Sequence, residues 1–168
     1  MRLRIAVITL FALVCLTLTQ ARSGEHQAPG HGERMEIMLF PSDSIGWQKG
    51  PPSLPPGAMM AVLEGDPTRE GPFVFRLKLP DGYHVPPHTH PKTERITVIS
   101  GTFNVGMGDK FNENQTRPMP AGTYGYWPTG MKHFVWAKGE TVLQFHGTGP
   151  WSIQYVNPED DPRTSKTK

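Results

Sequence analysis

Apolar and polar side chains alternate along much of this chain, most clearly between Phe73 and Leu79. Four apolar side chains share one face of this segment, and Val74, Arg76 and Lys78 share the other. A period of two residues indicates a half-buried β-strand. Further apolar or alternating segments predict strands at "AMMAVLEG", "RITVIS", "TFNVGM", "GTYGYWP", "HFVWA", "TVLQFHG" and "SIQYV". No segment sustains the period of 3.6 residues that indicates a helix.

Glycine and proline are frequent, with 18 of each spread along the 168 residues. Short strands joined by turns rich in these residues are typical of an antiparallel sandwich or barrel of the jelly-roll type. The sequence contains no internal repeat, and its 8 Phe, 4 Trp and 4 Tyr suffice for one packed core. We therefore predict an all-β fold with one domain at residues 35–157. It begins with "MEIMLF", a candidate edge strand, and an irregular arm whose prolines disfavour regular pairing.

The N-terminus has the features of an export signal. Arg2 and Arg4 precede the apolar run "IAVITLFALVCLTL", and "TQA" precedes a cleavage point after Ala21. The alternative is a membrane anchor, but the apolar run is short for a membrane span and polar sequence follows it. We therefore expect a periplasmic or secreted protein that leaves the membrane after cleavage. Three segments then flank the domain: a signal peptide at 1–21, a flexible leader at 22–34 and a flexible charged tail at 158–168.

Cysteine content and charge exclude several classes of function. The only cysteine, Cys15, lies inside the predicted signal peptide, so the processed protein has no thiol. Catalysis by cysteine and a cysteine-based zinc finger are therefore excluded. Cleavage would also remove Arg2 and Arg4 from the 17 Lys and Arg, which leaves 15 basic residues against 15 acidic ones. This balance argues against nucleic acid or an anionic membrane as a partner.

Three histidines and one glutamate carry the candidate chemistry. His88 and His90 are two residues apart, a spacing that puts both side chains on one face of a strand. Glu94 follows after a short irregular stretch, and His133 stands near the start of another apolar strand. Two imidazoles and a carboxylate inside an apolar barrel are costly unless a cation neutralises and orients them. We therefore predict a metal site, to which His133 could add a fourth ligand from across the barrel.

The same residues carry a resemblance to a known family. The chain matches cupin motif 1, G-x5-H-x-H-x3-E-x6-G, at Gly82, His88, His90, Glu94 and Gly101, and motif 2, G-x5-P-x-G-x2-H, at Gly122, Pro128, Gly130 and His133. Ala137 replaces the usual Asn of motif 2, which is not a ligand. From Leu54 to Pro162 the chain also resembles small exported cupins related to the cupin-type domain of ChrR-like anti-sigma factors. It shows no counterpart of their helical zinc-binding half, so we do not expect an anti-sigma function.

The resemblance implies a single cupin barrel and one divalent metal ion bound by His88, His90, Glu94 and His133. Three imidazoles and one carboxylate suit Fe, Mn, Ni, Cu or Zn, and the sequence does not choose among these metals. A cupin that has lost its metal is the alternative. With all four ligand positions filled, we expect that metal binding is retained.

Two classes of function remain open for such a site. Four protein ligands leave one or two positions free, where a small organic substrate and O2 could bind. This favours a metal-dependent dioxygenase or related oxidoreductase with Glu94 as its base, and the same ligands would serve an isomerase or lyase. The alternative is a non-catalytic cupin that binds or senses a small molecule, since cupins have many functions. Gln144 and His146 share a strand face and are candidates to support the metal ligands or contact the substrate. We also allow for a homodimer.

Overall fold

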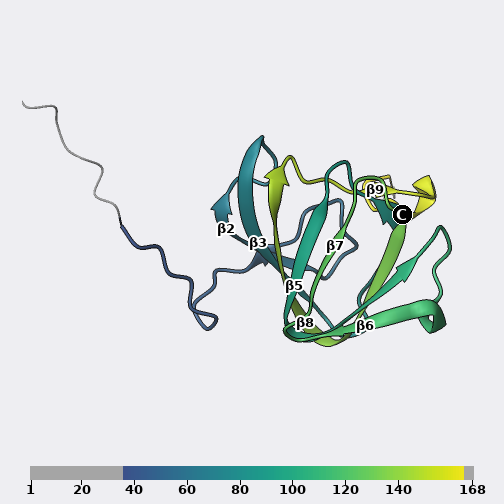
Figure 1. Ribbon diagram of the computed structural model, residues 1–168, viewed down its shortest axis with the longest axis horizontal. Coiled ribbons are helices and arrows are strands. Elements are labelled where there is room, and N and C mark those ends of the chain that lie inside the picture. Colours follow the sequence, from purple (N-terminus) through teal and green to yellow (C-terminus); the bar gives the residue numbers. More distant parts are fainter. Residues whose placement is uncertain (1–35, 165–168) are drawn as a thin grey trace, which may run out of the picture. The chain divides into compact units, whose positions relative to one another are not determined.

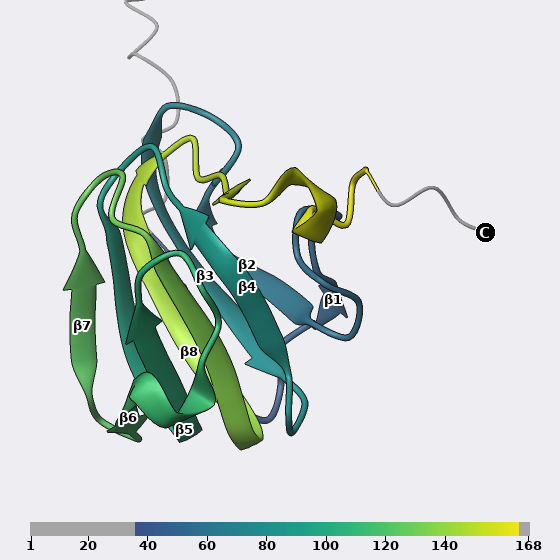
Figure 2. The same cartoon turned by 90° about the vertical axis from the view of Figure 1, so that its right-hand side faces the viewer.

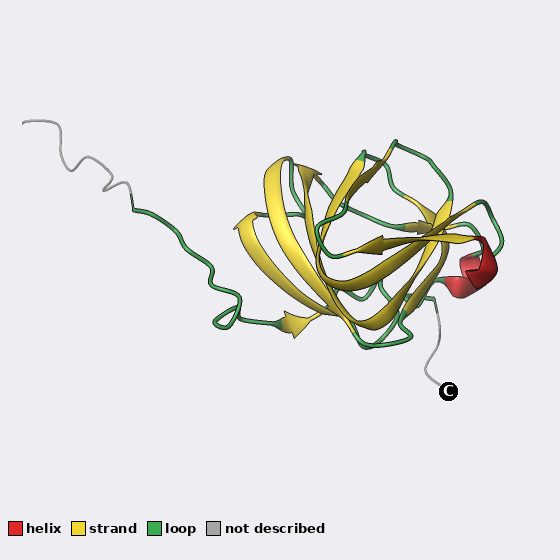
Figure 3. Ribbon diagram, turned by 60° about the horizontal axis from the view of Figure 1, so that its bottom comes forward, coloured by secondary structure: helices red, strands yellow, loops and turns green. Residues whose placement is uncertain are grey.

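The alternating segments form strands in the computed structural model, which describes residues 36–164. The predicted signal peptide at 1–21, the leader at 22–34 and the last four residues of the tail lie outside the described residues. Within 36–164 the regular secondary structure is strand (Figure 3), apart from two short 3-10 helices, η1 (Glu113–Gln115) and η2 (Pro158–Asp160). The strands are β1 (Gln48–Lys49), β2 (Met59–Gly65), β3 (Gly71–Leu79), β4 (His84–Thr89), β5 (Glu94–Met107), β6 (Thr116–Pro120), β7 (Tyr124–Trp127), β8 (His133–Gly149) and β9 (Gln154–Tyr155).

All the strand pairs are antiparallel, and the sheet curls so that its two walls face each other (Figures 1 and 2). The strand order is β1-β2-β3-β8-β4-β9, and β5 pairs with β6, β7 and β8. The predicted alternation in β3 is confirmed, because Phe73, Phe75, Leu77 and Leu79 are buried while the residues between them are partly exposed. The all-β jelly-roll barrel predicted from the sequence is therefore confirmed.

The two longest strands each combine two of the segments predicted as separate strands. β5 contains "RITVIS" and "TFNVGM", and β8 contains "HFVWA" and "TVLQFHG". Their pairing register shifts between Val98 and Thr102, where the two strands bend together. Gly101 lies at this bend with φ +77°, and a Cβ there would lie 2.5 Å from the carbonyl oxygen of Glu140. Only glycine avoids both the strained backbone and this close contact, which explains the final glycine of motif 1.

The barrel core lies between the two walls. Its fully buried members include Phe75, Ile96, Val98 and Leu143, which come from β3, β5 and β8. The connection from β1 to β2 runs along this core and inserts Leu54 into it. One side of the interior is therefore closed by a loop, and not by a strand.

The two ends of the described chain differ from expectation. Described residues 36–40, where we expected an edge strand, have no strand, and Ile37 is 83% exposed. Residues 158–164, which we expected to be flexible, contain η2, and the Arg163 guanidinium donates to the Ile153 carbonyl at 3.1 Å. Arg163 also pairs with Asp161 inside this stretch, and its bond to Ile153 attaches the stretch to the rest of the fold, which the charged composition does not indicate. Among residues 36–164, no helix is long and apolar enough to cross a membrane.

Candidate metal centre

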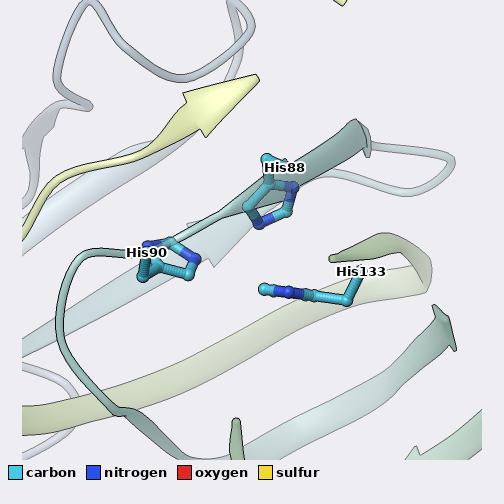
Figure 4. A group of neighbouring side chains, drawn as sticks. All are labelled: His88, His90 and His133. Carbon is cyan, nitrogen blue, oxygen red and sulfur yellow. The ribbon is translucent and has the colours of Figure 1, made fainter. Parts of the chain in front are cut away.

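Strand pairing brings the predicted ligands together. His88 is in β4 and lies opposite His133, the first residue of β8, with ring centroids 4.2 Å apart. His90 follows the end of β4, and Glu94 is the first residue of β5. Figure 4 shows the three imidazoles directed toward a common point from β4, from the loop after it and from β8. The sequence predicted this set, and the structure brings all four residues into one site.

The distances within the site are short. The nearest ring nitrogens of His88, His90 and His133 all lie within 4.8 Å of one another, so these three histidines could hold a metal ion. Glu94 Oε1 lies 3.2 Å from His90 Nε2, and Glu94 Oε2 lies 3.6 Å from His133 Nε2. All four side chains are buried, at 5% exposure or less. Glu94 thus contacts two of the three histidines directly.

Backbone carbonyl oxygens orient all three rings. Each histidine Nδ1 faces a carbonyl: Pro86 at 2.7 Å from His88, Ser152 at 2.8 Å from His90, and Met131 at 3.1 Å from His133. A carbonyl oxygen only accepts, so each Nδ1 must carry the hydrogen, and in the neutral ring Nε2 keeps its lone pair. This is the usual arrangement behind metal-binding histidines.

The site has more electron-pair donors than hydrogens to share among them. The buried Nε2 atom of His90 has no hydrogen-bond partner among the described residues, although Glu94 Oε1 is 3.2 Å away. Two acceptors at this distance repel each other unless a proton or a cation lies near them. Three imidazole lone pairs and a carboxylate form a donor set that fits a divalent transition metal. The residues present therefore fit the metal that the sequence predicted.

The electrostatics of the protein alone agree with this arrangement. Burial lowers the pKa of His88 to about 3, and the neighbouring His133 and His90 add to this effect. Burial also opposes charge on His90, but the Glu94 carboxylate outweighs it and raises the pKa of His90. Burial disfavours the charged form of Glu94 as well, yet His90 and His133 hold its pKa well below the usual range. Glu94 is therefore an anion at neutral pH, and His88 is neutral.

Two tryptophans flank the ligands, and sequence reasoning missed the role of one of them. The Trp151 indole N–H donates to Glu94 Oε1 at 3.0 Å, and its ring stacks on His90 with centroids 5.7 Å apart. The Trp127 ring stacks on His133 with centroids 5.5 Å apart, and its indole N–H makes no hydrogen bond to the Glu94 side chain in the described structure. No motif spacing links Trp151 to Glu94, because the two residues are 57 positions apart. Only the docking of the segment after β8 brings them together.

The ligands lie at one side of a small apolar cavity. It offers about 30 Å³ to the centres of water-sized molecules, which is room for about two waters. Apart from the four predicted ligands, Tyr83 and Trp151 are the lining residues with polar side-chain atoms. The rest of the lining is apolar: Leu54, Leu77, Leu79, Val85, Ile96, Phe103, Val135, Leu143, Phe145 and Ile153.

The structure does not bring Gln144 and His146 into this site. They alternate along β8 with Leu143 and Phe145, which line the cavity, and so they lie on the opposite face of the strand. Gln144 accepts a hydrogen bond from Arg76 at 3.1 Å, and His146 stacks on Tyr124 with centroids 6.1 Å apart. The prediction that they support the ligands or contact the substrate is wrong, because the pleat directs them to the outside.

A curled jelly-roll barrel with three histidines and a glutamate at one side of its interior defines a cupin. The family model described as the ChrR cupin-like domain matches residues 35–152, and the chain belongs to this family. Germin-like protein 5-1 of Oryza sativa subsp. japonica is 36% identical over 86 residues, which are 51% of this chain and 38% of that protein. The chain thus spans well under half the length of this relative.

Solved structures share the fold at low sequence identity. The polyketide cyclase RemF from Streptomyces resistomycificus has a TM-score of 0.58 and 14% identity, over 76% of this chain and 90% of that one. A candidate acetylacetone dioxygenase from Methylibium petroleiphilum has a TM-score of 0.56 and 16% identity, over 79% and 90%. At this identity the likeness concerns the fold alone.

Proposed function

We propose that this protein is a metal-dependent oxidoreductase, specifically a dioxygenase that acts on a small organic molecule. One divalent metal ion would be held by His88, His90, Glu94 and His133. The observation that carries the proposal is the convergence of three imidazole Nε2 atoms and a carboxylate on one point of an apolar cavity. Such a donor set is unfavourable by itself and becomes favourable around a cation.

The residues of this chain prepare the site in three ways. The carbonyl oxygens of Pro86, Met131 and Ser152 hold the imidazoles with Nε2 directed inward, so little reordering is needed on binding. Glu94 supplies one negative charge, and the Trp151 N–H restrains one of its oxygens. A bound divalent metal would polarise substrate oxygen and, if redox-active, mediate electron transfer. The apolar lining excludes bulk water from the reacting groups.

Glu94 is also placed to accept a proton. Its Oε1 receives the Trp151 N–H, while Oε2 lies 3.6 Å from His133 Nε2. A substrate that binds as an enolate or phenolate must lose a proton, and this carboxylate is the anionic group beside the imidazoles. The export features of residues 1–21 support a location outside the cytoplasm.

The first experiment measures metal content and O2 uptake. Protein purified without added metal is analysed for its elements, then loaded with Fe(II) and mixed with small enols, phenols and diketones. We expect about one metal ion per chain and O2 consumption with at least one compound. Glu94→Gln should abolish uptake while part of the metal is retained, because the amide keeps an oxygen donor but loses the charge and the base. Full uptake by Glu94→Gln would exclude the proposed role of this residue.

A second candidate function is favoured by the family to which the chain belongs. The ChrR cupin-like domain model matches most of the described residues, and a binding or sensing module would use the same pocket without turnover. Zinc at one ion per chain, with no O2 uptake for any compound after Fe(II) loading, would replace the dioxygenase proposal with this one.

A further inference from the structure

A proline-rich segment between β1 and β2, residues 51–57, borders the cavity through Leu54, and we call it the cap segment. Four of its seven residues are proline, so its backbone is stiff. It lies between Gly50, whose N–H donates to the Ala58 carbonyl at 2.8 Å, and Gly57, which has φ +111°. A stiff segment between a close backbone contact and a left-handed glycine is suited to move as one unit.

Leu54 is the side chain that the cap segment places in the cavity. It is 7% exposed and lines the cavity together with Tyr83 and Ile153. Two tyrosine hydroxyls hold the backbone on either side of it. Tyr155 donates to the Ser53 carbonyl at 2.8 Å, and Tyr83 donates to the Pro55 carbonyl at 2.6 Å. The cap segment is therefore attached beside the ligands, since Tyr155 pairs with His88 in the β4–β9 ladder.

The cavity is too small for most organic molecules while Leu54 occupies its present position. About 30 Å³ is open to the centres of water-sized molecules, which corresponds to about two waters. A ligand of more than a few heavy atoms must displace Leu54 or another lining side chain. Leu54 lies outside the strands, as do Tyr83, Trp151 and Ile153, whereas Leu77, Leu143 and Phe145 belong to paired strands. Displacement of the cap segment breaks no ladder hydrogen bond, because none of residues 51–57 belongs to a strand.

The charge of the site restricts the ligand further. A divalent cation and the Glu94 carboxylate together carry a single net positive charge. A monoanion neutralises that charge, whereas a dianion leaves a buried negative charge in an apolar cavity. Among the described residues, the lining contains no Lys or Arg, the Tyr83 hydroxyl is bonded to Pro55, and the Trp151 N–H is bonded to Glu94. No further donor is therefore free to compensate a second charge.

We propose that the site takes small apolar molecules that bind through oxygen as monoanions, such as the enolates of β-diketones, and that Leu54 sets their size limit. This inference rests on the proposed metal site and specifies its substrate class. It distinguishes the site from one for a small dicarboxylate, because a dicarboxylate brings two charges and almost no apolar surface. The cap segment then serves as the entrance, held closed by Tyr83 and Tyr155.

The test uses the Zn(II)-loaded protein, because zinc has no redox chemistry and binding can be measured without turnover. Acetylacetone, its bulkier tert-butyl analogue 2,2-dimethylhexane-3,5-dione, and oxalate are titrated by calorimetry, and the zinc retained by the protein is measured after each titration. We expect acetylacetone to bind at least about tenfold more tightly than 2,2-dimethylhexane-3,5-dione, because the larger molecule clashes with Leu54. Oxalate should also bind at least about tenfold more weakly than acetylacetone, because its second charge stays buried.

Leu54→Ala removes three carbon atoms from the lining and should remove most of the discrimination against 2,2-dimethylhexane-3,5-dione without improving oxalate binding. Leu39→Ala makes the same chemical change at a side chain that is 76% exposed, and it should behave like the parent protein. If Leu54→Ala folds poorly, Tyr155→Phe deletes only the hydroxyl bond to Ser53. It should then raise the association rate of acetylacetone several-fold, because the closed cap segment is less stable.

The outcomes separate this inference from the proposed function. Failure to bind zinc would remove the metal site and with it the proposed function. Zinc binding with equal affinity for both diketones, or with oxalate as the tightest ligand, would overturn the substrate class alone. A Leu54→Ala protein with the selectivity of the parent would show that Leu54 does not set the size limit, and an unchanged association rate in Tyr155→Phe would count against the cap segment as the entrance.

Discussion

The hydrogen bond from Trp151 to Glu94 provides the sharpest test of the site, because a matched control exists in the same chain. Trp151→Phe keeps an aromatic ring against His90 but deletes the N–H that donates to Glu94 Oε1 at 3.0 Å. Trp127→Phe makes the same change beside His133, where the indole stacks on the imidazole but does not bond to Glu94 in the described structure. The two variants therefore share the loss of indole packing and differ in one hydrogen bond.

The expected magnitude follows from the charge on the acceptor. Hydrogen bonds to charged groups contribute about 1.5–3 kcal/mol, and Glu94 is a buried carboxylate. Reducing an indole to a phenyl ring costs about 1 kcal/mol more in packing at either position. In metal-free protein we therefore expect Trp151→Phe to lower the free energy of unfolding by about 2–4 kcal/mol. The loss in Trp127→Phe should be near the packing cost alone.

The assay is urea unfolding of the metal-free proteins, combined with a double-mutant cycle between Trp151→Phe and Glu94→Met, which removes the acceptor at similar side-chain volume. We expect a coupling energy of about 1.5–3 kcal/mol between these two positions. Metal binding offers a second measurement, because the Co(II) absorption spectrum responds to how the carboxylate is held. It should change in Trp151→Phe and remain unchanged in Trp127→Phe. Equal stability losses in the two variants, with a coupling energy near zero, would show that this hydrogen bond does not support the site.

Three further predictions concern the ligands and the bent strands. A chelator should lower the melting temperature of the parent protein, because bound metal stabilises the fold by mass action. The melting temperature of His90→Ala, which holds little metal, should stay nearly unchanged. An equal drop in both proteins would contradict the assignment of His90 as a ligand. Metal-free protein should lose stability on acidification below about pH 6.5, where the opposite contribution from the raised pKa of His90 is already complete. The pKa of His88 falls from near 6.5 in the unfolded chain to about 3 in the folded protein. Its contribution to the free energy of unfolding is therefore complete above about pH 6.5 and is lost as the pH falls toward 3. The lowered pKa of Glu94 acts in the same direction below its own unfolded value, so a melting temperature that rises on acidification would refute this. Gly101→Ala should destabilise the protein by more than about 3 kcal/mol, since its Cβ would lie 2.5 Å from a backbone oxygen. Gly108→Ala, with φ +113° but no described atom within 4 Å of that Cβ, should lose only about 1–2 kcal/mol, as urea unfolding can measure.

Sequence pattern predicted the barrel because most of its strands leave a local trace, although β1 and β6 were not among the predicted strands. The alternation in β3 and the frequent glycine turns need no tertiary information to recognise. The bends of β5 and β8 were not predicted, because Gly101 and Gly139 look like ordinary turn signals between separate strands. In the structure both glycines have positive φ, and the pairing continues past them with a shifted register. Whether such a glycine ends a strand or bends it depends on the partner strand.

The four candidate ligands were predictable from their spacing, whereas their supports were not. His146 was assigned wrongly, although the alternation of "TVLQFHG" already contained the correction. Leu143 and Phe145 are the large apolar residues of that segment, so they must face the core and their neighbours must face outward. For Trp151 no such signal exists, because its hydrogen bond to Glu94 joins two segments whose relation is set by the complete barrel.

The three carbonyl contacts of the imidazoles differ in origin, and this difference links the metal centre to the fold. Those of His88 and His133 come from Pro86 and Met131, two residues earlier in each case, so they form wherever the local backbone is extended. The contact of His90 comes from Ser152, 62 residues away, next to the tryptophan that bonds to Glu94. Two of the four candidate ligands are therefore held by local sequence, and the other two by one segment after β8. Because that segment can orient His90 and Glu94 only once the barrel has closed, the donor set becomes complete only in the folded protein.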